Sequence, residues 1–268
     1  MMKVYRMVFI LLFLLMSMGT FSQAKSTKEQ KSVVTIPQSV FNIAKENTYP
    51  NPTQDMPSLQ PSELTKELLS TSKVKIENPQ LIRMLNESAI NKSPFSIGVR
   101  ATVFLGEWPL NYESTETAPN WEYQKINTNY FDNRSGKRNY QLHYVQESQK
   151  TIKGGLTAKV PHSEEVQKMM MLKAAEKTKL PLASVTTIGA GTKNNQVYNI
   201  APKRLGYLYA YAPAINEKGK VTYGEVYIVL KGWKKSIVVK NVTSQGIGAW
   251  IPIQDYVSFG FMATDKPR

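Results

Sequence analysis

The sequence predicts a β-rich α+β fold with a mostly antiparallel sheet built from hairpins. We also expect two or three short to medium helices and an extended proline-rich N-terminal arm. Three observations support this prediction. Many segments alternate apolar and polar residues, Gly- and Asn-containing turns separate them, and few segments carry helix-capping signals. Short strands joined by such turns favour antiparallel pairing over the strand–helix alternation of a parallel sheet.

Residues 1–24 match a secretory signal peptide. Two basic residues precede an unbroken apolar stretch at 7–16, and Ser22 and Ala24 place small residues three and one before a cleavage point. We therefore expect cleavage after Ala24 and an extracytoplasmic protein, either secreted or associated with the cell envelope. The alternative is an uncleaved N-terminal membrane anchor. The short apolar stretch disfavours it, because a spanning helix needs about 20 apolar residues.

An extended arm follows at residues 25–69. It contains five prolines between positions 37 and 61, and proline at that density prevents a regular helix. The stretch 33–43 is too apolar for a free linker, so we expect part of the arm to lie on the domain surface. Residues 70–268 are predicted to form a single β-rich domain, which is long enough to bury its own core.

Two helix signals lie close together near the end of the arm. Ser62 is the predicted N-cap of a short helix that ends near Ser70. Asn78 is the predicted N-cap of a helix over 79–88, in which Pro79 takes the first helical position.

The third helix has the strongest end signals. Ser163 is its predicted N-cap, acidic residues fill its first turn, lysines lie in its last turn, and Pro181 ends it. Met170, Met171, Ala174, Ala175 and Thr178 fall on one face of this helix, and three methionines follow one another at 169–171. At helical spacing such a stripe is interpreted as core packing rather than as a soft ligand-binding surface.

The rest of the domain is predicted to be strands. The loop 132–136 reads as the turn of a hairpin, and 216–219 and 231–235 as further turns. Gly154 and Gly155 indicate a bulge or bend inside a strand. The predicted strands are 97–105, 121–130, 139–146, 151–160, 205–212, 221–230, 236–240 and 256–262.

Composition limits the chemistry. The chain has no Cys, which excludes a thiol nucleophile, disulfides and Cys-ligated metals, and it has only two His, so we expect no metal site and no cofactor. The net charge is +14, and removing residues 1–24 lowers it by two to +12. Of the 32 remaining basic residues, 26 are Lys and six are Arg. Because Lys acts as a hydrated point charge, this excess favours diffuse attraction to an anionic wall polymer or membrane surface, and no nucleic acid is expected.

One predicted turn combines an aromatic ring with basic charge. The stretch 231–235 contains Lys231, Trp233, Lys234 and Lys235 at a hairpin tip. Trp favours the boundary between water and lipid, and each Lys near an anionic surface adds about 1 kcal/mol of attraction. The four residues are therefore the candidate binding site. The alternative is a Trp233 ring folded back onto its own sheet, beside solvated turn lysines.

A second, enzymatic hypothesis rests on carboxylates near aromatic rings. Glu113 and Glu116 lie between Trp108 and Trp121, and acid pairs flanked by aromatic rings are typical of glycan-cleaving enzymes. The spacing itself specifies no reaction, so catalytic residues are not assigned and Glu113 and Glu116 are the alternative.

Four long segments resemble the YfkD-like family of Bacillus-type Gram-positive bacteria. They are ENTYPNPTQDMPSLQPSELTKELL (46–69), GEWPLNYESTETAPNWEYQKINTNY (106–130), LGYLYAYAPAINEKGKVTYGEVYIVLKG (205–232) and NVTSQGIGAWIPIQDYVSFGF (241–261). The resemblance implies a secreted or envelope-located bacterial protein. It implies no activity, cofactor or catalytic residue.

These observations favour a non-enzymatic extracytoplasmic protein with a binding or structural role at the cell envelope. The partner is an anionic wall polymer, a membrane surface or another envelope protein.

Overall fold

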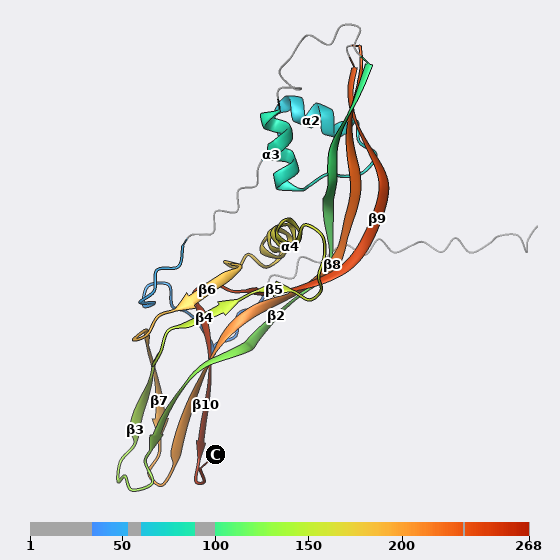
Figure 1. Cartoon of the computed structure of the whole chain (residues 1–268). Helices are drawn as coiled ribbons and strands as arrows, with labels where there is room; N and C mark the ends of the chain where they lie inside the picture. Colours follow the sequence, from blue (N-terminus) through green and yellow to red (C-terminus); the bar gives the residue numbers. More distant parts are fainter. Residues whose placement is uncertain (1–33, 53–59, 89–99, 233, 268) are drawn as a thin grey trace, which may run out of the picture. The chain divides into compact units, whose positions relative to one another are not determined.

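A long central strand organises the fold, which we describe from a computed structural model covering residues 34–52, 60–88, 100–232 and 234–267 (Figure 1). These residues belong to one compact unit. The described residues include three helices of 8, 9 and 16 residues, and every strand pairing among them is antiparallel. The β-rich α+β prediction is confirmed. The predicted signal peptide lies outside the described residues.

Strand β8 (Leu205–Lys231) is the centre of the largest sheet. Along one edge it pairs with β2 (Arg100–Asp132) over its whole length. Along the other edge it pairs first with β10 (Tyr256–Thr264) and then with β9 (Lys234–Pro252). The β2–β8 pairing contains five register shifts. Such bulges increase local twist and protect a long edge strand against pairing with another chain.

The shorter strands extend this sheet or form small sheets beside it. Strand β1 (Val40–Asn42) pairs with β10, and β5 (Gly155–Leu156) pairs with β9. The two separate pairs are β3 (Tyr140–Val145) with β7 (Lys193–Ile200), and β4 (Lys150–Lys153) with β6 (Val185–Ile188). The bend predicted at Gly154–Gly155 is confirmed, because it separates β4 from β5.

The predicted turn at 216–219 is wrong, because β8 passes through it as a continuous strand. These residues pair with β2 on one side and β9 on the other, so their backbone groups are used in both ladders. Glu217 is fully buried and accepts hydrogen bonds from the hydroxyls of Tyr112 (2.9 Å) and Thr117 (2.6 Å). Pairing and buried hydrogen bonds therefore override the turn-like composition of this segment.

The hairpin predicted around 132–136 is also wrong. The segment 121–130 belongs to β2 and pairs with β8, whereas the segment after the loop becomes β3 and pairs with β7. Asparagine side chains connect the two segments instead. Asn129 accepts a hydrogen bond from the Val145 amide (3.0 Å) and donates one to the Val145 carbonyl (2.8 Å).

The predicted ends of the first two helices are confirmed. In α2 (Glu63–Ser70), the Ser62 hydroxyl accepts from the Thr65 amide. In α3 (Pro79–Glu87), the Asn78 side chain accepts from the amides of Gln80 and Leu81.

The predicted cap of the third helix is wrong. Helix α4 (Ser163–Thr178) begins at Ser163 itself. Its N-cap is His162, in the left-handed conformation (φ 52°) and without a side-chain capping bond. The ring of His162 instead stacks on Trp108, with 5.7 Å between ring centroids.

The N-terminal arm is partly built into the fold. Strand β1 extends the large sheet, and Ile43, which follows it, is fully buried. Leu68 of α2 is buried in the cluster that fills the space between the helices and the sheet. These parts of the arm therefore belong to the sheet and the core, and do not only lie on the domain surface as expected.

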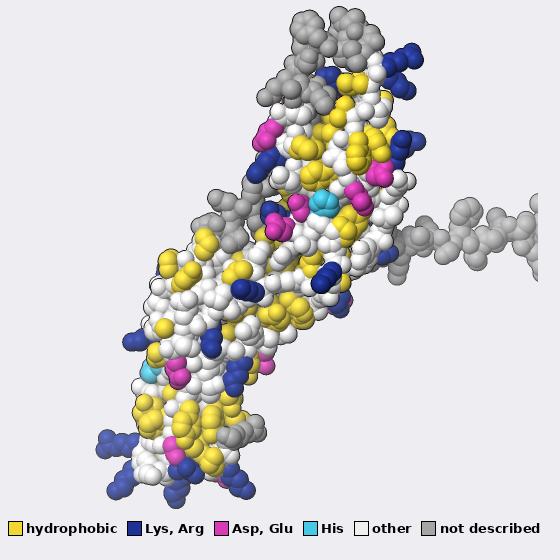
Figure 2. Space-filling view, in the orientation of Figure 1, with side chains coloured by type: hydrophobic (Ala, Val, Ile, Leu, Met, Phe, Trp, Pro, Cys, Tyr) yellow, Lys and Arg dark blue, Asp and Glu magenta, His cyan; other side chains and the backbone are white. Residues whose placement is uncertain are grey.

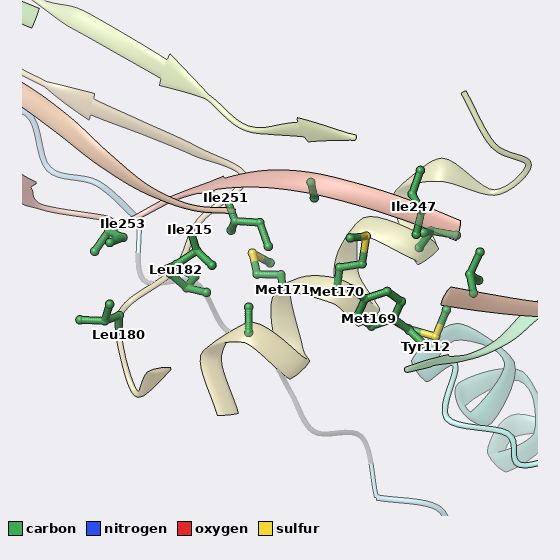
Figure 3. Close-up of a cluster of buried hydrophobic side chains, with 14 of the residues drawn as sticks. Tyr112, Met169, Met170, Met171, Leu180, Leu182, Ile215, Ile247, Ile251 and Ile253 are labelled. Carbon is green, nitrogen blue, oxygen red and sulfur yellow. The ribbon is translucent and has the colours of Figure 1, made fainter. Parts of the chain in front are cut away.

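The methionines of α4 belong to the core, as predicted. Met169, Met170 and Met171 lie beneath β9, where they contact a buried cluster that includes Ile247 and Ile251 (Figure 3). A second cluster lies around the start of β8, and a third lies between α2, α3 and the end of β8. Within the described residues, no helix has the length and hydrophobicity needed to span a membrane.

Candidate anion-binding site

The β8–β9 hairpin presents the predicted basic residues at one end of the large sheet. Strand β8 ends at Lys231, β9 begins at Lys234, and these two residues are paired. The turn between them includes Gly232 in the left-handed region (φ 60°), a conformation that glycine adopts without strain. Trp233 lies outside the described residues. The hairpin prediction is confirmed, and its role in binding stays a prediction.

A third basic residue completes a row across the hairpin. Arg100, the first residue of β2, pairs with Lys231, which in turn pairs with Lys234. Directly opposite residues in an antiparallel sheet share a face, so the three side chains lie on the same side of three adjacent strands. All three are exposed. We call this set the cationic row: Arg100, Lys231 and Lys234.

The cationic row lies on the face of the sheet that the helices leave uncovered. Ile228 on β8 and Ile237 on β9 are buried against α2 and α3. Since side chains alternate along a strand, Lys231 lies on the opposite face, and Lys235, which pairs with Leu230, lies on the helix side. Lys235 is half-buried and therefore does not belong to the row.

In the part of the chain that the structure describes, no carboxylate pairs with the cationic row. Among the described residues, none of its three side chains forms a salt bridge. Like charges placed directly opposite in a sheet are destabilising, by up to about 1 kcal/mol per pair. Repulsion within the row therefore lowers the stability of the fold, and a bound anion would relieve that repulsion. Figure 2 shows basic side chains gathered at this end of the sheet.

An aromatic pair lies further along the same face. Phe104 is 57% exposed and packs on Tyr227, with 5.0 Å between ring centroids. The Lys240 ammonium lies 4.8 Å from the centre of the Tyr227 ring. Glu225 accepts hydrogen bonds from the Tyr227 hydroxyl (2.7 Å) and from the side-chain nitrogen of Asn241 (2.8 Å). These two bonds hold the pKa of Glu225 below its usual value. The only acid in this group is thus already engaged.

The alternative acid pair lies on strand β2 rather than in a loop. Glu113 and Glu116 are exposed, and their partners on β8 are Lys220 and Lys218. The Lys218 ammonium lies 2.9 Å from the Glu116 carboxylate. A glycan-cleaving general acid usually owes its raised pKa to burial, and neither residue has that environment.

Trp108 and Trp121, the tryptophans of the enzymatic hypothesis, already make contacts within the fold. The Trp108 indole donates to the Leu105 carbonyl (3.0 Å) and stacks on His162. Trp121 is half-buried against the core cluster of α4. The two rings therefore do not form an open stacking platform beside the carboxylates. In the described part of the chain, no group of His and acidic residues is arranged to hold a metal ion.

Sequence reasoning missed two features of these sites. Arg100 is separated from Lys231 by most of the domain, and no local pattern connects the two residues. Glu217 was part of a predicted turn, although it is the buried acid of the sheet. Burial and the neighbouring Glu217 carboxylate both raise the pKa of Tyr112. The one sequence signal for a buried acid such as Glu217 is a polar residue at a strand position where the alternation predicts an apolar one.

Together these features define a protein built around a long antiparallel sheet with a basic hairpin at one end. The chain belongs to the YfkD-like protein family, whose model matches residues 37–268.

A curated relative, the uncharacterized protein YfkD of Bacillus subtilis (strain 168), is 66% identical over 233 residues. The match covers 87% of this chain and 88% of the relative. Among solved structures, a crystal structure of a lamprey immune protein is similar at 8% identity with a TM-score of 0.23. That match covers 62% of this chain and 53% of the lamprey protein.

Proposed function

We propose that this protein is a non-enzymatic binding protein of the bacterial cell envelope, and that it holds an anionic polymer of the wall through the cationic row. The proposal combines the basic hairpin with the signal-peptide pattern of residues 1–24, which directs the chain out of the cytoplasm with cleavage after Ala24. The net charge of +12 that remains after cleavage attracts any polyanion at long range. The row would supply the local contact.

One observation carries the proposal: three cations stand side by side without a carboxylate partner in the described residues. Adjacent strands lie about 4.8 Å apart, so the row extends over about 10 Å. A polymer with charges repeated along its backbone contacts all three cations at once. Binding would replace like-charge repulsion within the row by attraction to the ligand.

A wall polymer is favoured over a lipid surface by the residues beside the row. The next residues on the same face are Thr102, Val229 and Ser236, which are directly opposite one another. None of them is aromatic, and two carry hydroxyl groups. The two hydroxyl groups suit a hydrated polymer, whereas the exposed Phe104 ring, two residues further along β2, is the feature of this face that would suit a lipid surface. The predicted contact through Trp233 remains a separate prediction, since that residue lies outside the described ones.

The test is binding of the purified chain to isolated wall polymer and, in a parallel measurement, to anionic lipid vesicles. Each basic residue at an anionic surface contributes about 1 kcal/mol, so Arg100→Gln/Lys231→Gln/Lys234→Gln should weaken binding by about 3 kcal/mol, or roughly 100-fold. Binding should disappear near 0.5 M salt, where the Debye length is about 4 Å.

The control variant is Lys150→Gln/Lys153→Gln, which removes two exposed charges from β4. It should bind almost as well as the original chain. Equal losses in both variants would mean that total charge matters and the row does not. Tight binding to vesicles with weak binding to the polymer would reassign the ligand to the membrane.

A further inference from the structure

A second basic surface lies at the other end of β8. It is formed by the loop between β2 and β3 (133–139) and the loop between β7 and β8 (201–204). Figure 2 shows basic side chains gathered at this end of the sheet also. We call this surface the loop pair. Its exposed cations are Arg134, Lys137, Arg138, Lys203 and Arg204.

A buried asparagine holds the two loops together. Asn133 is only 5% exposed, although it lies in a loop. Its amide donates to the Arg204 carbonyl (2.9 Å), and its own carbonyl accepts from the Lys203 amide (3.0 Å). Its side chain donates to the carbonyls of Arg138 and Ile200, each at 2.9 Å. The five cations are therefore presented by one hydrogen-bonded unit rather than by two independent loops.

The backbone of the loop pair is specialised to maintain this arrangement. Lys203 has a φ of 65°, a left-handed conformation that residues other than glycine rarely adopt. Gly136 donates its amide to the Asn133 carbonyl (3.1 Å), and a Cβ atom at Gly136 would lie 1.7 Å from the Asn133 side-chain oxygen. A larger residue at this position would therefore displace the asparagine that joins the loops.

The charge of the loop pair is mostly uncompensated. Asp132 forms a two-pronged salt bridge with Arg134, whose guanidinium nitrogens lie 2.7 and 3.0 Å from its oxygens, and this contact holds the pKa of Asp132 below its usual value. Among the described residues, the other four cations form no salt bridge. Five cations and one carboxylate leave a net charge of +4. Asp265 and Lys266, which follow the nearby end of β10, add one charge of each sign.

The loop pair is also the part of the chain where arginine is concentrated. Downstream of residue 24 the chain has six Arg among 32 basic residues, and three of the six lie in these two loops. A planar guanidinium donates two parallel hydrogen bonds to a phosphate, whereas an ammonium acts as a point charge. The composition of the loop pair therefore differs from the lysine-rich remainder of the surface in a way that suits phosphate groups.

We propose that the loop pair binds phosphate groups repeated along an anionic polymer. All five cations are exposed, so none lies in an enclosed pocket that would hold a single small anion without its water. Exposed contacts are individually weak, and a ligand must make several of them together to bind. A chain with phosphate groups at short intervals meets that requirement, because it can cross both loops at once.

This inference is independent of the cationic row. The row lies at the end of β8 that carries Lys231, whereas the loop pair precedes Leu205. The 27 residues of β8 separate the two surfaces, and no residue belongs to both of them. Substitutions in the loop pair and in the cationic row can therefore be tested separately for their effect on binding.

The experiment measures binding of long-chain inorganic polyphosphate to the full chain by isothermal titration calorimetry. The variant Arg138→Lys/Arg204→Lys preserves charge and removes two guanidinium groups, and it should weaken binding by about tenfold. Arg83→Lys makes the same chemical change at an exposed position on α3 and should have no effect. Gly136→Ala, which preserves every charge, should also weaken binding several-fold because it separates the loops.

Polyglutamate of matched charge tests the preference for phosphate. The original chain should bind it more weakly than polyphosphate, and the Arg-to-Lys variant should bind both polymers about equally. The same titrations in a Lys231→Gln/Lys234→Gln background remove most of the cationic row's contribution. The proposal is overturned if Arg138→Lys/Arg204→Lys binds polyphosphate within twofold of the original chain, or if polyglutamate binds that chain as tightly as polyphosphate.

Discussion

Asn78 joins helix α3 to the sheet, and its replacement by Ala should be among the more damaging polar substitutions in the protein. The residue is fully buried. Its side-chain oxygen accepts from the amides of Gln80 (2.9 Å) and Leu81 (3.2 Å), and its side-chain nitrogen donates to the Pro109 carbonyl (2.7 Å). One side chain thus caps the helix and ties it to β2.

The expected magnitude is the sum of two losses. Removing an N-cap side chain costs about 1 kcal/mol. Leaving a buried carbonyl such as that of Pro109 without its donor costs about 1–3 kcal/mol. Asn78→Ala should therefore lower the free energy of unfolding by about 2–4 kcal/mol. Asn78→Ser keeps a capping oxygen but loses the bond to Pro109, so it should cost about 1–3 kcal/mol, less than Ala.

Urea unfolding, followed by circular dichroism, measures these differences. The matched control is Ser62→Ala, which removes the exposed cap of α2 and should cost only about 0.5–1 kcal/mol. The reasoning would be refuted if Asn78→Ala cost no more than Ser62→Ala. It would also be refuted if Asn78→Ser and Asn78→Ala were equally destabilising, because the cap would then contribute nothing.

Two further predictions concern charge and pH. Burial raises the pKa of both Tyr112 and Tyr144 above 10, so their contribution to stability should be complete below about pH 10 and should decline as the pH rises toward their folded-state values. Urea midpoints should therefore fall as the pH rises from 10 to 11, and less so in Tyr144→Phe; equal falls would contradict this. Lys231→Gln should raise the free energy of unfolding by a few tenths of a kcal/mol at low salt, because it relieves repulsion within the cationic row. A loss of stability on that substitution would show that the lysine has a partner.

Local signals in the sequence predicted the fold class and the ends of two helices. Capping depends on residues two or three positions apart, so Ser62, Asn78 and Pro79 were sufficient. The methionines of α4 were assigned to the core for a similar reason, because Met170 and Met171 share a helix face with Ala174. In these places the stabilising contacts join residues that are close in the sequence, so the sequence alone is enough to predict them.

Long-range pairing was the part that local signals did not predict. The composition of 216–219 favours a turn, but β2 and β9 pair with it on both sides and Glu217 finds two buried donors. The loop after β2 resembles a hairpin turn, but β2 pairs with β8 and the following strand β3 pairs with β7. In both places tertiary contacts outweigh the preferences of a short segment.

The candidate site shows the same limit. The hairpin with Lys231 and Lys234 was predicted because its two strands are adjacent in the sequence. Arg100 was missed because it joins them only through the third strand. The loop pair was missed because Asn133 connects residues about 70 positions apart. A single sequence gives no signal for either contact.

The most direct test of the cationic row is the salt dependence of binding to purified wall polymer. When a basic residue pairs with an anionic group, it releases a counterion, so the logarithm of the affinity falls linearly with the logarithm of the salt concentration. Replacing Arg100, Lys231 and Lys234 by Gln should make this slope shallower by about 2 to 3, one unit or slightly less for each lost contact. The control Lys150→Gln/Lys153→Gln should leave the slope unchanged. An equal slope for the original chain and the row variant would contradict the proposal that the row holds the polymer.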